Sequence, residues 1–289
     1  MSIIVDKNTR VMIQGITGQI GLQYANRMSQ GYTNLVAGVT PGKGGQEVCG
    51  VPVYNTVREA VLNQRPTLSM IVVPPKQVLG AVFETIEQGV KIIEVYTDEV
   101  PLHDISKMIS YAKKEGVTLI GPGAAGVVTP EQCNISEISE KLLAPGNIGV
   151  LTKSGSLCGE VLRFMGKENI GQSTVCAVGG GFITGLRLKD VMEMFIKDEL
   201  TSHIVMLGEV GGADEIEAAE VIAKAEKPVL AYVAGHYAPP GVRMGHAGAI
   251  LGEVQDSADH KTKVLREAGA LVADCINDLF DLMCETKIN

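Results

Sequence analysis

The sequence predicts an α/β protein made of two successive domains, each built on a largely parallel β-sheet. At 289 residues, the chain has the length of two ordinary domains. Hydrophobic residues make up 45% of it, but only 4% are aromatic and Trp is absent, which suits the aliphatic strands of buried parallel sheets. Short apolar runs alternate with helical patterns along most of the chain, as in βαβ units.

The first half of the chain repeats the order strand, glycine turn, helix. A short apolar run at residues 10–14 ends at Gly15, and a helical stretch follows it. The same alternation continues for about four more units, which favours a parallel sheet with crossover helices. We expect strands at 10–14, 35–38, 69–73, 91–96 and 117–120, and helices at 21–29, 57–63, 77–88 and 104–114.

The pattern loosens after residue 122, where Pro130 and Pro145 interrupt any regular element. We therefore expect a first domain at residues 1–122, a linker at 123–146 and a second domain at 147–289. The alternation restarts in the second domain. We expect strands at 147–151, 174–178, 202–207 and 229–233, a Gly/Pro-rich loop at 234–252, and helices at 157–167, 188–196, 215–224, 260–268 and 278–284, with a short strand before the last helix.

Composition narrows the range of partners. The formal net charge of −8 gives no overall field to attract a nucleic acid or an anionic membrane. No apolar run approaches the roughly 18 residues of a membrane-spanning helix, and the N-terminus has no targeting pattern. The six Cys and five His show no metal-ligand spacing. We therefore expect a cytoplasmic protein with reduced thiols and with no metal site, nucleic acid or membrane.

A glycine motif, Gly15-x-x-Gly18-x-x-Gly21, follows the first strand and opens a helix, where backbone N–H groups favour a phosphate. Its spacing differs from the dinucleotide pattern G-x-G-x-x-G, and a turn without a ligand explains it equally well. The second strand lacks the acidic residue that holds a nicotinamide ribose, and it leads instead to Lys43 in a glycine-rich loop. Together these features favour a phosphate-bearing cofactor.

Two further segments of the second domain contain reactive or anion-binding residue types. Ser154 opens a helix after a strand, which indicates a helix cap more than an anion site when taken alone. His246 lies among small residues in the loop after the strand at 229–233, and Glu209 ends another apolar strand. A carboxylate on one ring nitrogen fixes the tautomer and leaves the other nitrogen free to attack. By itself the histidine could equally be structural.

Taken together, these segments resemble the α subunit of succinyl-CoA synthetase, from the ADP- or GDP-forming acid–CoA ligase family. The resemblance covers nearly the whole chain, and its most specific run is Arg243-Met244-Gly245-His246-Ala247-Gly248-Ala249. It implies a Rossmann-like CoA-binding domain followed by a flavodoxin-like ligase domain. The other matching runs are Gly15-x-Thr17-Gly18-x-x-Gly21, Val39-Thr40-Pro41-Gly42-Lys43-Gly44-Gly45, Ser154-Gly155-x-Leu157 and Gly208-Glu209-x-Gly211-Gly212.

The resemblance also implies a role for each site residue. His246 becomes transiently phosphorylated and is held by Glu209, while acyl-CoA forms from a small carboxylic acid, CoA and a nucleoside triphosphate. Ser154, Gly155 and Gly159 contact the phosphate or the substrate. ATP or GTP with Mg²⁺ lies on a separate ATP-grasp β subunit, in an αβ or α2β2 assembly. CoA is bound by Thr17, Gly18, Gln19, Ile20, Lys43, Tyr96, Thr97 and Asp98.

Some segments depart from the usual pattern of that family. Gly-Pro-Asn-Cys-Pro-Gly is replaced by Gly121-Pro122-Gly123-Ala124-Ala125-Gly126, a Tyr by Gly159, and Gly-Gly-Asp-Pro by Gly179-Gly180-Gly181-Phe182. Because these segments are expected to shape the carboxylate pocket, the acid could be other than succinate, either bulkier or bearing another anionic group. A CoA-binding paralogue without catalysis and an NAD-linked oxidoreductase are the remaining alternatives. The glycine spacing and the missing ribose carboxylate weigh against the oxidoreductase.

Overall fold

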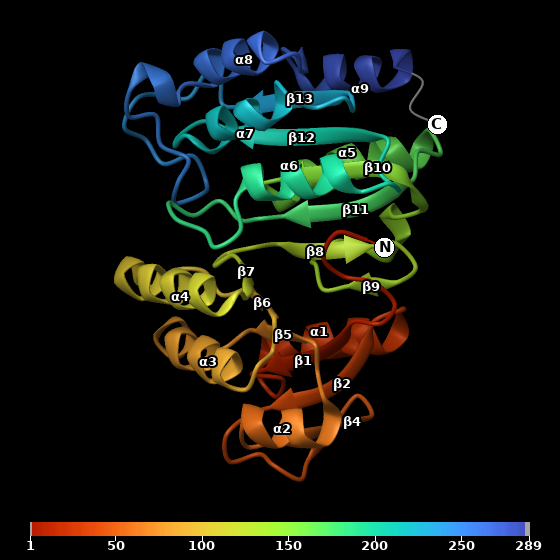
Figure 1. Ribbon diagram of the computed structural model, residues 1–289, viewed down its shortest axis with the longest axis vertical. Coiled ribbons are helices and arrows are strands. Elements are labelled where there is room, and N and C mark those ends of the chain that lie inside the picture. Colours follow the sequence, from red (N-terminus) through yellow and green to blue (C-terminus); the bar gives the residue numbers. More distant parts are fainter. Residues whose placement is uncertain (1, 287–289) are drawn as a thin grey trace. The chain divides into compact units, whose positions relative to one another are not determined.

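The computed structural model describes residues 2–286, which separate into two compact units (Figure 1). The first unit comprises residues 5–136 with 183–186, and the second comprises residues 2–4, 137–182 and 187–286. Strands and helices alternate through both units, which confirms the predicted α/β class. Among residues 2–286 we find no helix with the length and apolar character of a membrane span.

The first unit is built on a sheet with the strand order of a Rossmann-like fold. Its six parallel strands follow one another across the sheet in the order 3-2-1-4-5-6 when they are counted along the chain. A short strand, β3 (Glu47–Val48), pairs antiparallel with the edge strand β4. The parallel strands are β1 (Arg10–Gln14), β2 (Asn34–Val39), β4 (Val51–Tyr54), β5 (Leu68–Ile71), β6 (Ile92–Val95) and β7 (Thr118–Ile120).

Helices cover both faces of this sheet. The crossover after β1 runs in the opposite direction across the sheet from the crossovers after β5 and β6. Right-handed connections therefore put α1 (Gln19–Gln30) on one face and α3 (Pro75–Glu87) and α4 (Leu102–Glu115) on the other. The helix α2 (Val57–Gln64) packs beside α3. Buried aliphatic side chains from β5, β6, α3 and α4 form one core cluster, which confirms the aliphatic core expected from composition.

Two stretches contain strands that the sequence analysis does not expect. Residues 40–54 hold β3 and β4. The sequence analysis misses β4 because this strand is only four residues long and includes Pro52. Residues 123–146, expected as a linker, hold the antiparallel strands β8 (Gly126–Thr129) and β9 (Cys133–Asn134) and a 3₁₀ turn at Glu140–Leu142. Such short elements leave too few residues for a periodic pattern to be read.

The second unit contains five parallel strands in a flavodoxin-like order. The order across the sheet, β14-β13-β12-β10-β11, is 2-1-3-4-5 when it is counted from β11 and numbered along the chain. The direction of winding reverses between β10 and β12, which are hydrogen-bonded neighbours. The strands are β10 (Pro145–Thr152), β11 (Gln172–Ala177), β12 (His203–Glu209), β13 (Val229–Ala234) and β14 (Leu271–Ala273).

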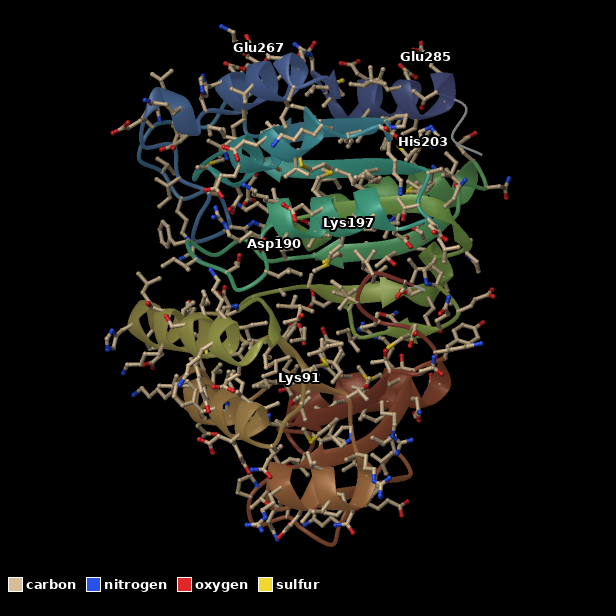
Figure 2. All side chains as sticks on the ribbon, in the orientation of Figure 1. Lys91, Asp190, Lys197, His203, Glu267 and Glu285 are labelled. Carbon is tan, nitrogen blue, oxygen red and sulfur yellow. The ribbon has the colours of Figure 1, made fainter. Side chains whose placement is uncertain are left out.

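The helices of the second unit also form two layers. The first and last, α5 (Gly155–Lys167) and α9 (Ile276–Glu285), meet through the stacked rings of Phe164 and Phe280, whose centroids are 4.1 Å apart. The other layer consists of α6 (Leu188–Lys197), α7 (Asp214–Ile222) and α8 (Ala258–Glu267), packed in that order. Charged side chains such as Glu267 and Glu285 lie on the outer, exposed side of their helices (Figure 2).

The glycine motif after β1 is explained by three different backbone requirements. Gly15 has a φ of +86°, a left-handed conformation that favours glycine. Gly18 is the N-cap of α1. A Cβ on Gly21 would lie only 2.2 Å from the Gly15 carbonyl oxygen, so α1 packs directly on the turn that precedes it. The motif therefore holds the first turn of α1 against the end of β1.

Replacing Gly21 with Ala should destabilise the protein, because the new methyl group meets backbone atoms that cannot move aside. We expect a loss of about 1–3 kcal/mol in the free energy of unfolding, measured by urea denaturation. Gly80→Ala is the matched control, since Gly80 is an exposed glycine in α3 with nothing within 4 Å of an added Cβ. That variant should gain about 0.5–1 kcal/mol. Equal effects at the two positions would contradict the close contact at Gly21.

Candidate active site

The candidate site lies where the winding of the second sheet reverses, at the carboxyl ends of β10 and β12. In open α/β sheets, ligands bind in the crevice at such a switch point, because the connections on either side leave toward opposite faces. Thr152 at the end of β10 pairs with Leu207 of β12, and Glu209 ends β12 two residues later. Lys153 and Ser154, which follow β10, therefore emerge close to Glu209.

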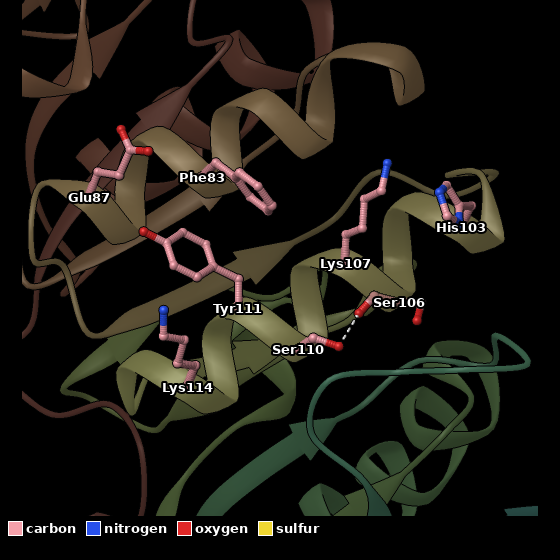
Figure 3. Close-up of a pocket in the computed structure, with 8 residues that line it drawn as sticks. All are labelled: Phe83, Glu87, His103, Ser106, Lys107, Ser110, Tyr111 and Lys114. Carbon is pink, nitrogen blue, oxygen red and sulfur yellow. Dashed lines mark hydrogen bonds between the residues drawn. The ribbon is translucent and has the colours of Figure 1, made fainter.

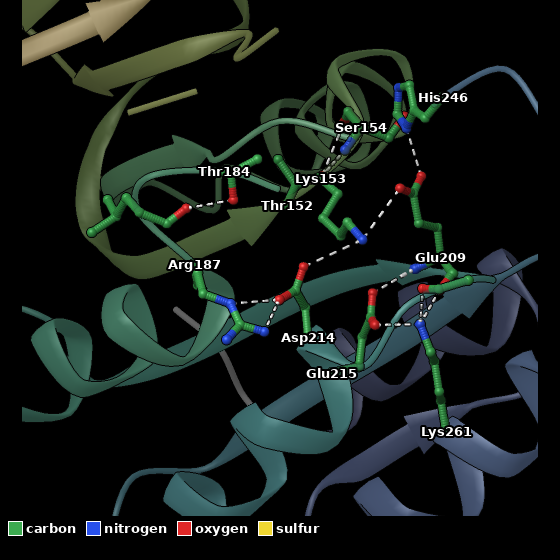
Figure 4. Close-up of polar contacts among 12 residues, drawn as sticks. Thr152, Lys153, Ser154, Thr184, Arg187, Glu209, Asp214, Glu215, His246 and Lys261 are labelled. Carbon is green, nitrogen blue, oxygen red and sulfur yellow. Dashed lines mark hydrogen bonds and ion pairs between the residues drawn. The ribbon is translucent and has the colours of Figure 1, made fainter. Parts of the chain in front are cut away.

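The structure brings His246 and Glu209 together although they are far apart in the sequence. His246 Nδ1 lies 2.6 Å from Glu209 Oε2, as a hydrogen bond of the pair shown in Figure 4. The imidazole side chain is 35% exposed, whereas the Glu209 side chain is only 9% exposed. The arrangement orients the ring from one side and leaves part of it accessible to solvent.

Glycines allow the backbone to approach His246 closely. A Cβ on Gly180, in the loop after β11, would lie 2.2 Å from His246 Cγ. The Gly248 N–H donates to the Gly180 carbonyl oxygen at 2.9 Å, which ties the two loops together. Gly180 is a position at which the run Gly179-Gly180-Gly181-Phe182 keeps the glycine of the family pattern given above, and here it makes room for the histidine ring.

Behind Glu209, charged side chains of alternating sign form a chain of contacts (Figure 4). Lys153 Nζ lies 3.5 Å from Glu209 Oε1 and 3.6 Å from Asp214 Oδ2. Asp214 in turn accepts hydrogen bonds from the Arg187 guanidinium at 2.6 and 2.9 Å. The sequence analysis assigns no role to these three residues. The only sequence signal for Lys153 is its place between an apolar strand and Ser154.

Ser154 caps the helix α5, as its sequence context indicates. Its Oγ accepts a hydrogen bond from the Leu157 N–H at 3.4 Å and lies 3.3 Å from Ser156 Oγ. Gly155 is the first residue of α5, and Gly159 lies one turn further along the helix. A Cβ on Gly159 would have nothing within 4 Å, so there is open space beside this position of the helix.

In the first unit, the expected phosphate-binding residues gather at the carboxyl ends of β1 and β2. Thr17 Oγ1 lies 3.2 Å from Thr40 Oγ1, which joins the glycine turn to the loop that carries Lys43. Gly18, Gln19 and Lys43 are exposed, Ile20 is partly buried, and no side chain caps the N-terminus of α1. The uncapped N–H groups and a nearby lysine suit an anionic phosphate.

Other residues near this edge are held by polar contacts. Asn55, which the sequence analysis misses, accepts hydrogen bonds from the N–H groups of Gly42 and Gly44 at 2.9 and 3.0 Å and so shapes the Lys43 loop. Three further residues expected to bind CoA, Tyr96, Thr97 and Asp98, follow the strand β6. Tyr96 packs against the ring of Tyr24, Thr97 donates to the Val73 carbonyl oxygen at 2.7 Å, and Asp98 is exposed.

A separate cavity of about 550 Å³ lies along α3 and α4 (Figure 3). It is lined by Phe83, Tyr111, Lys107 and Lys114 among others, and none of the residues expected at CoA contributes to it. Within residues 2–286, no group of three or more His, Cys, Asp or Glu side chains is arranged to hold a metal ion. The candidate sites therefore remain the two sheet edges.

Comparison with known proteins assigns the chain to a family. A CoA-binding domain profile matches residues 6–98, and a CoA-ligase profile matches residues 151–271. Subunit alpha 2 of the ADP-forming succinate–CoA ligase of Archaeoglobus fulgidus is 43% identical over 285 residues, which is 99% of each chain. The chain belongs to the family of succinyl-CoA synthetase α subunits. The Aquifex aeolicus ADP-forming subunit alpha is 42% identical over 277 residues, covering 95% of this chain and 91% of that one.

Solved structures share the fold at lower identity. ATP citrate lyase from Methanothrix soehngenii, determined with citrate and coenzyme A, matches 99% of this chain with a TM-score of 0.85 at 23% identity. This chain spans about half, 52%, of that lyase chain. The dinucleotide-forming acetyl-CoA synthetase 1 of Ca. Korarchaeum cryptofilum matches 95% of this chain with a TM-score of 0.77 at 22% identity, and this chain covers 60% of it.

A fully buried ion pair supports the backbone at Glu209. The side chains of Glu215 and Lys261 are both 0% exposed and contact each other. Glu215 Oε1 accepts a hydrogen bond from the Glu209 N–H at 3.0 Å, and Lys261 Nζ donates to the Glu209 carbonyl oxygen at 2.8 Å. Both polar groups of the Glu209 backbone are therefore fixed by this pair, which positions the carboxylate that holds His246.

Lys261→Met should destabilise the fold, because it leaves the buried Glu215 carboxylate without its counter-charge. We expect a loss of about 3–5 kcal/mol in the free energy of unfolding, measured by urea denaturation. Lys263→Met is the control on the same helix, since the Lys263 side chain is 73% exposed and pairs only loosely with Glu267. The control should unfold as the wild type does. A Lys261→Met protein of unchanged stability would show that the pair does not support the site.

Proposed function

We propose that this protein is the α subunit of an NDP-forming acid–CoA ligase that carries phosphate on His246. The observation that carries the proposal is the 2.6 Å contact between His246 Nδ1 and the buried Glu209 carboxylate. It fixes the proton on Nδ1, so that Nε2 carries the lone pair that makes a nucleophilic attack. The same contact weighs against a CoA-binding paralogue without catalysis, since such a protein does not need the pair.

The chemistry divides one difficult step into easier ones. Nε2 of His246 attacks the terminal phosphorus of a nucleoside triphosphate, and the phosphorus–oxygen bond to the leaving diphosphate breaks. A carboxylate oxygen of the acid then takes the phosphoryl group from His246, which gives an acyl phosphate and frees the imidazole. Phosphate is a far better leaving group than oxide, so a thiolate can displace it and form the thioester. The N-terminus of α5 at Ser154 and Gly155 stabilises the phosphate in transit.

CoA supplies that thiol, and the first unit offers residues that fit its phosphates. We propose that the turn formed by Thr17, Gly18, Gln19 and Ile20 binds the pyrophosphate. The Gly18 N–H is engaged with the Gly15 carbonyl oxygen at 2.9 Å, so the donors are the N–H groups of Thr17, Gln19 and Ile20, and the Lys43 ammonium adds a positive charge. The uncapped start of α1 and the exposure of Lys43 support this assignment. Tyr96, Thr97 and Asp98, which follow β6, complete the expected CoA site. The corresponding domains are residues 1–122 for CoA and 147–289 for the ligase chemistry.

A partner must supply the nucleotide. The relatives are named as alpha subunits, which supports a β subunit as partner. We propose that the partner is an ATP-grasp subunit that binds ATP or GTP with Mg²⁺, in an αβ or α2β2 assembly. The ADP-forming relatives favour ATP, and a cytoplasmic location suits all of these substrates.

The acid that fits the relatives' names is succinate. A second candidate is another carboxylic acid, and two observations favour it. Gly159 leaves open space at the start of α5, and Phe182 is 60% exposed in the loop after β11. Initial rates with succinate and with bulkier or tricarboxylic acids separate these candidates. A succinate rate well above all the others would remove the second.

The phosphoryl transfer can be tested by intact-mass spectrometry at alkaline pH, which preserves phosphohistidine. The chain is co-expressed with its β-type partner and incubated with Mg·ATP or Mg·GTP. We expect a gain of one phosphoryl group on the wild type, none on His246→Ala, and discharge when acid and CoA are added. The discharging acid identifies the substrate.

The matched control is His203→Ala, because His203 is a partly buried histidine in β12 outside the site. It should be phosphorylated as the wild type is. If an active partner and both nucleotides give no phosphate on the wild type, the ligase assignment fails and the CoA-binding paralogue becomes the leading alternative.

Lys43→Met should weaken CoA binding by about fivefold, since one exposed charge pair contributes about 1 kcal/mol. The effect should shrink as salt is added, because exposed charges are screened. Isothermal titration calorimetry measures the dissociation constants of CoA and of NAD for the wild type and the variant. The control is Lys113→Met, at an exposed lysine of α4. Binding of NAD in preference to CoA would support the oxidoreductase alternative instead.

A further inference from the structure

We propose that Lys153 is a positioning residue that keeps His246 neutral and therefore nucleophilic. The Lys153 ammonium balances the charge of the buried Glu209 carboxylate, so the imidazole does not have to take up a proton to do so. This inference rests on the proposed role of His246 as phosphate carrier. It concerns the protonation state of the ring before the attack, since an imidazolium has no lone pair on Nε2.

The two oxygens of Glu209 face different partners. Oε2 is 2.6 Å from His246 Nδ1, whereas Oε1 accepts no hydrogen bond from the described residues and faces Lys153 Nζ at 3.5 Å. The Lys153 side chain is only 3% exposed. Water therefore contributes little to balancing the Glu209 carboxylate, and its charge must be balanced by Lys153 or by a proton on the histidine.

The other nearby charges have closer partners than Glu209. Glu215 and Lys261 contact each other, and Asp214 pairs with the Arg187 guanidinium at 2.6 Å in addition to its longer contact with Lys153 at 3.6 Å. Within residues 2–286, the ion-pair partners of the Glu209 carboxylate are Lys153 and His246. The charged groups around the site are thus Glu209 on β12, Lys153 after β10, Asp214, Glu215 and Glu217 on α7, Arg187 before α6, Lys261 on α8 and the exposed Arg243 in the histidine's own loop.

Lys153 remains a cation in this environment. Burial by itself lowers the pKa of the Lys153 ammonium, but the carboxylates of Glu215, Glu209 and Asp214 outweigh it and hold that pKa above its ordinary value. The positive charge is therefore present throughout the neutral range. Without it, the site would hold an excess negative charge next to an imidazole, and a nearby negative charge favours the protonated form of that group.

The test is a titration of His246 by NMR in the full chain with isotope-labelled histidine. Lys153→Met should raise the titration midpoint of His246 by about one pH unit or more, and Lys153→Arg should leave it near the wild-type value. Asp214→Asn should move the midpoint the opposite way, because it leaves the positive charge of Lys153 less balanced. A purely structural role of Lys153 would not produce shifts of opposite sign.

The same variants are then phosphorylated in the complex with the β-type partner over a range of pH. Phosphorylation of Lys153→Met should fall about tenfold near neutral pH and recover as the pH rises, because deprotonation restores the Nε2 lone pair. Lys153→Arg should keep the wild-type profile. Lys189→Met is the control, since Lys189 forms an exposed ion pair with Glu220 in the same unit. It should change neither the midpoint nor the profile.

The outcomes separate this inference from the proposed function. An unchanged His246 midpoint in Lys153→Met, or a downward shift, overturns the role of Lys153 even if the wild type is phosphorylated normally. An upward shift without any phosphorylation of the wild type supports the charge balance and overturns the ligase assignment. If Lys153→Met does not fold, Asp214→Asn decides, since an unchanged or raised midpoint there overturns the inference.

Discussion

The pairing of β10 with β12 is the constraint on which the rest of the candidate active site depends. Because Thr152 lies opposite Leu207, the two strands stop side by side and their chains leave at the same sheet edge. The backbone hydrogen bonds between the two strands thereby bring the side chains of Lys153 and Glu209 together. A shift of the register by one residue would turn every side chain of one strand to the other face and separate these two charges.

Close backbone packing adds to this constraint at the loops around the sheet edge. A Cβ on Gly211 would lie 2.2 Å from the Gly248 carbonyl oxygen, and one on Gly180 would lie 2.2 Å from the His246 ring. Glycine at these positions lets the loops after β11, β12 and β13 approach one another closely, with the His246 ring packed on Gly180. His246 lies on a loop, but these contacts hold it in a fixed position. A reacting group has to be held in this way.

Sequence reasoning predicts the parts of this arrangement that leave a local pattern. Strand–helix alternation predicts the two α/β units, and the isolated His246 and the strand-ending Glu209 predict a pair that the structure brings together. The partners Lys153–Asp214 and Glu215–Lys261 leave no such pattern, because each joins distant segments and each lysine alone resembles a solvent-exposed one. Short strands such as β4, which contains Pro52, are not predicted because they have too few residues to show a periodic pattern.

A second histidine–carboxylate pair in the same unit shows why the surroundings of Glu209 matter. His236 Nδ1 lies 2.6 Å from Asp259 Oδ1, the same distance as in the His246–Glu209 pair, but the Asp259 side chain is 79% exposed whereas Glu209 is 9% exposed. Water can solvate the first carboxylate without help from a lysine. The buried one needs a fixed cation if its histidine is to stay neutral, because water is excluded from it. The same hydrogen bond thus orients a ring in both places, and the buried Lys153 is what distinguishes the surroundings of His246 from those of His236.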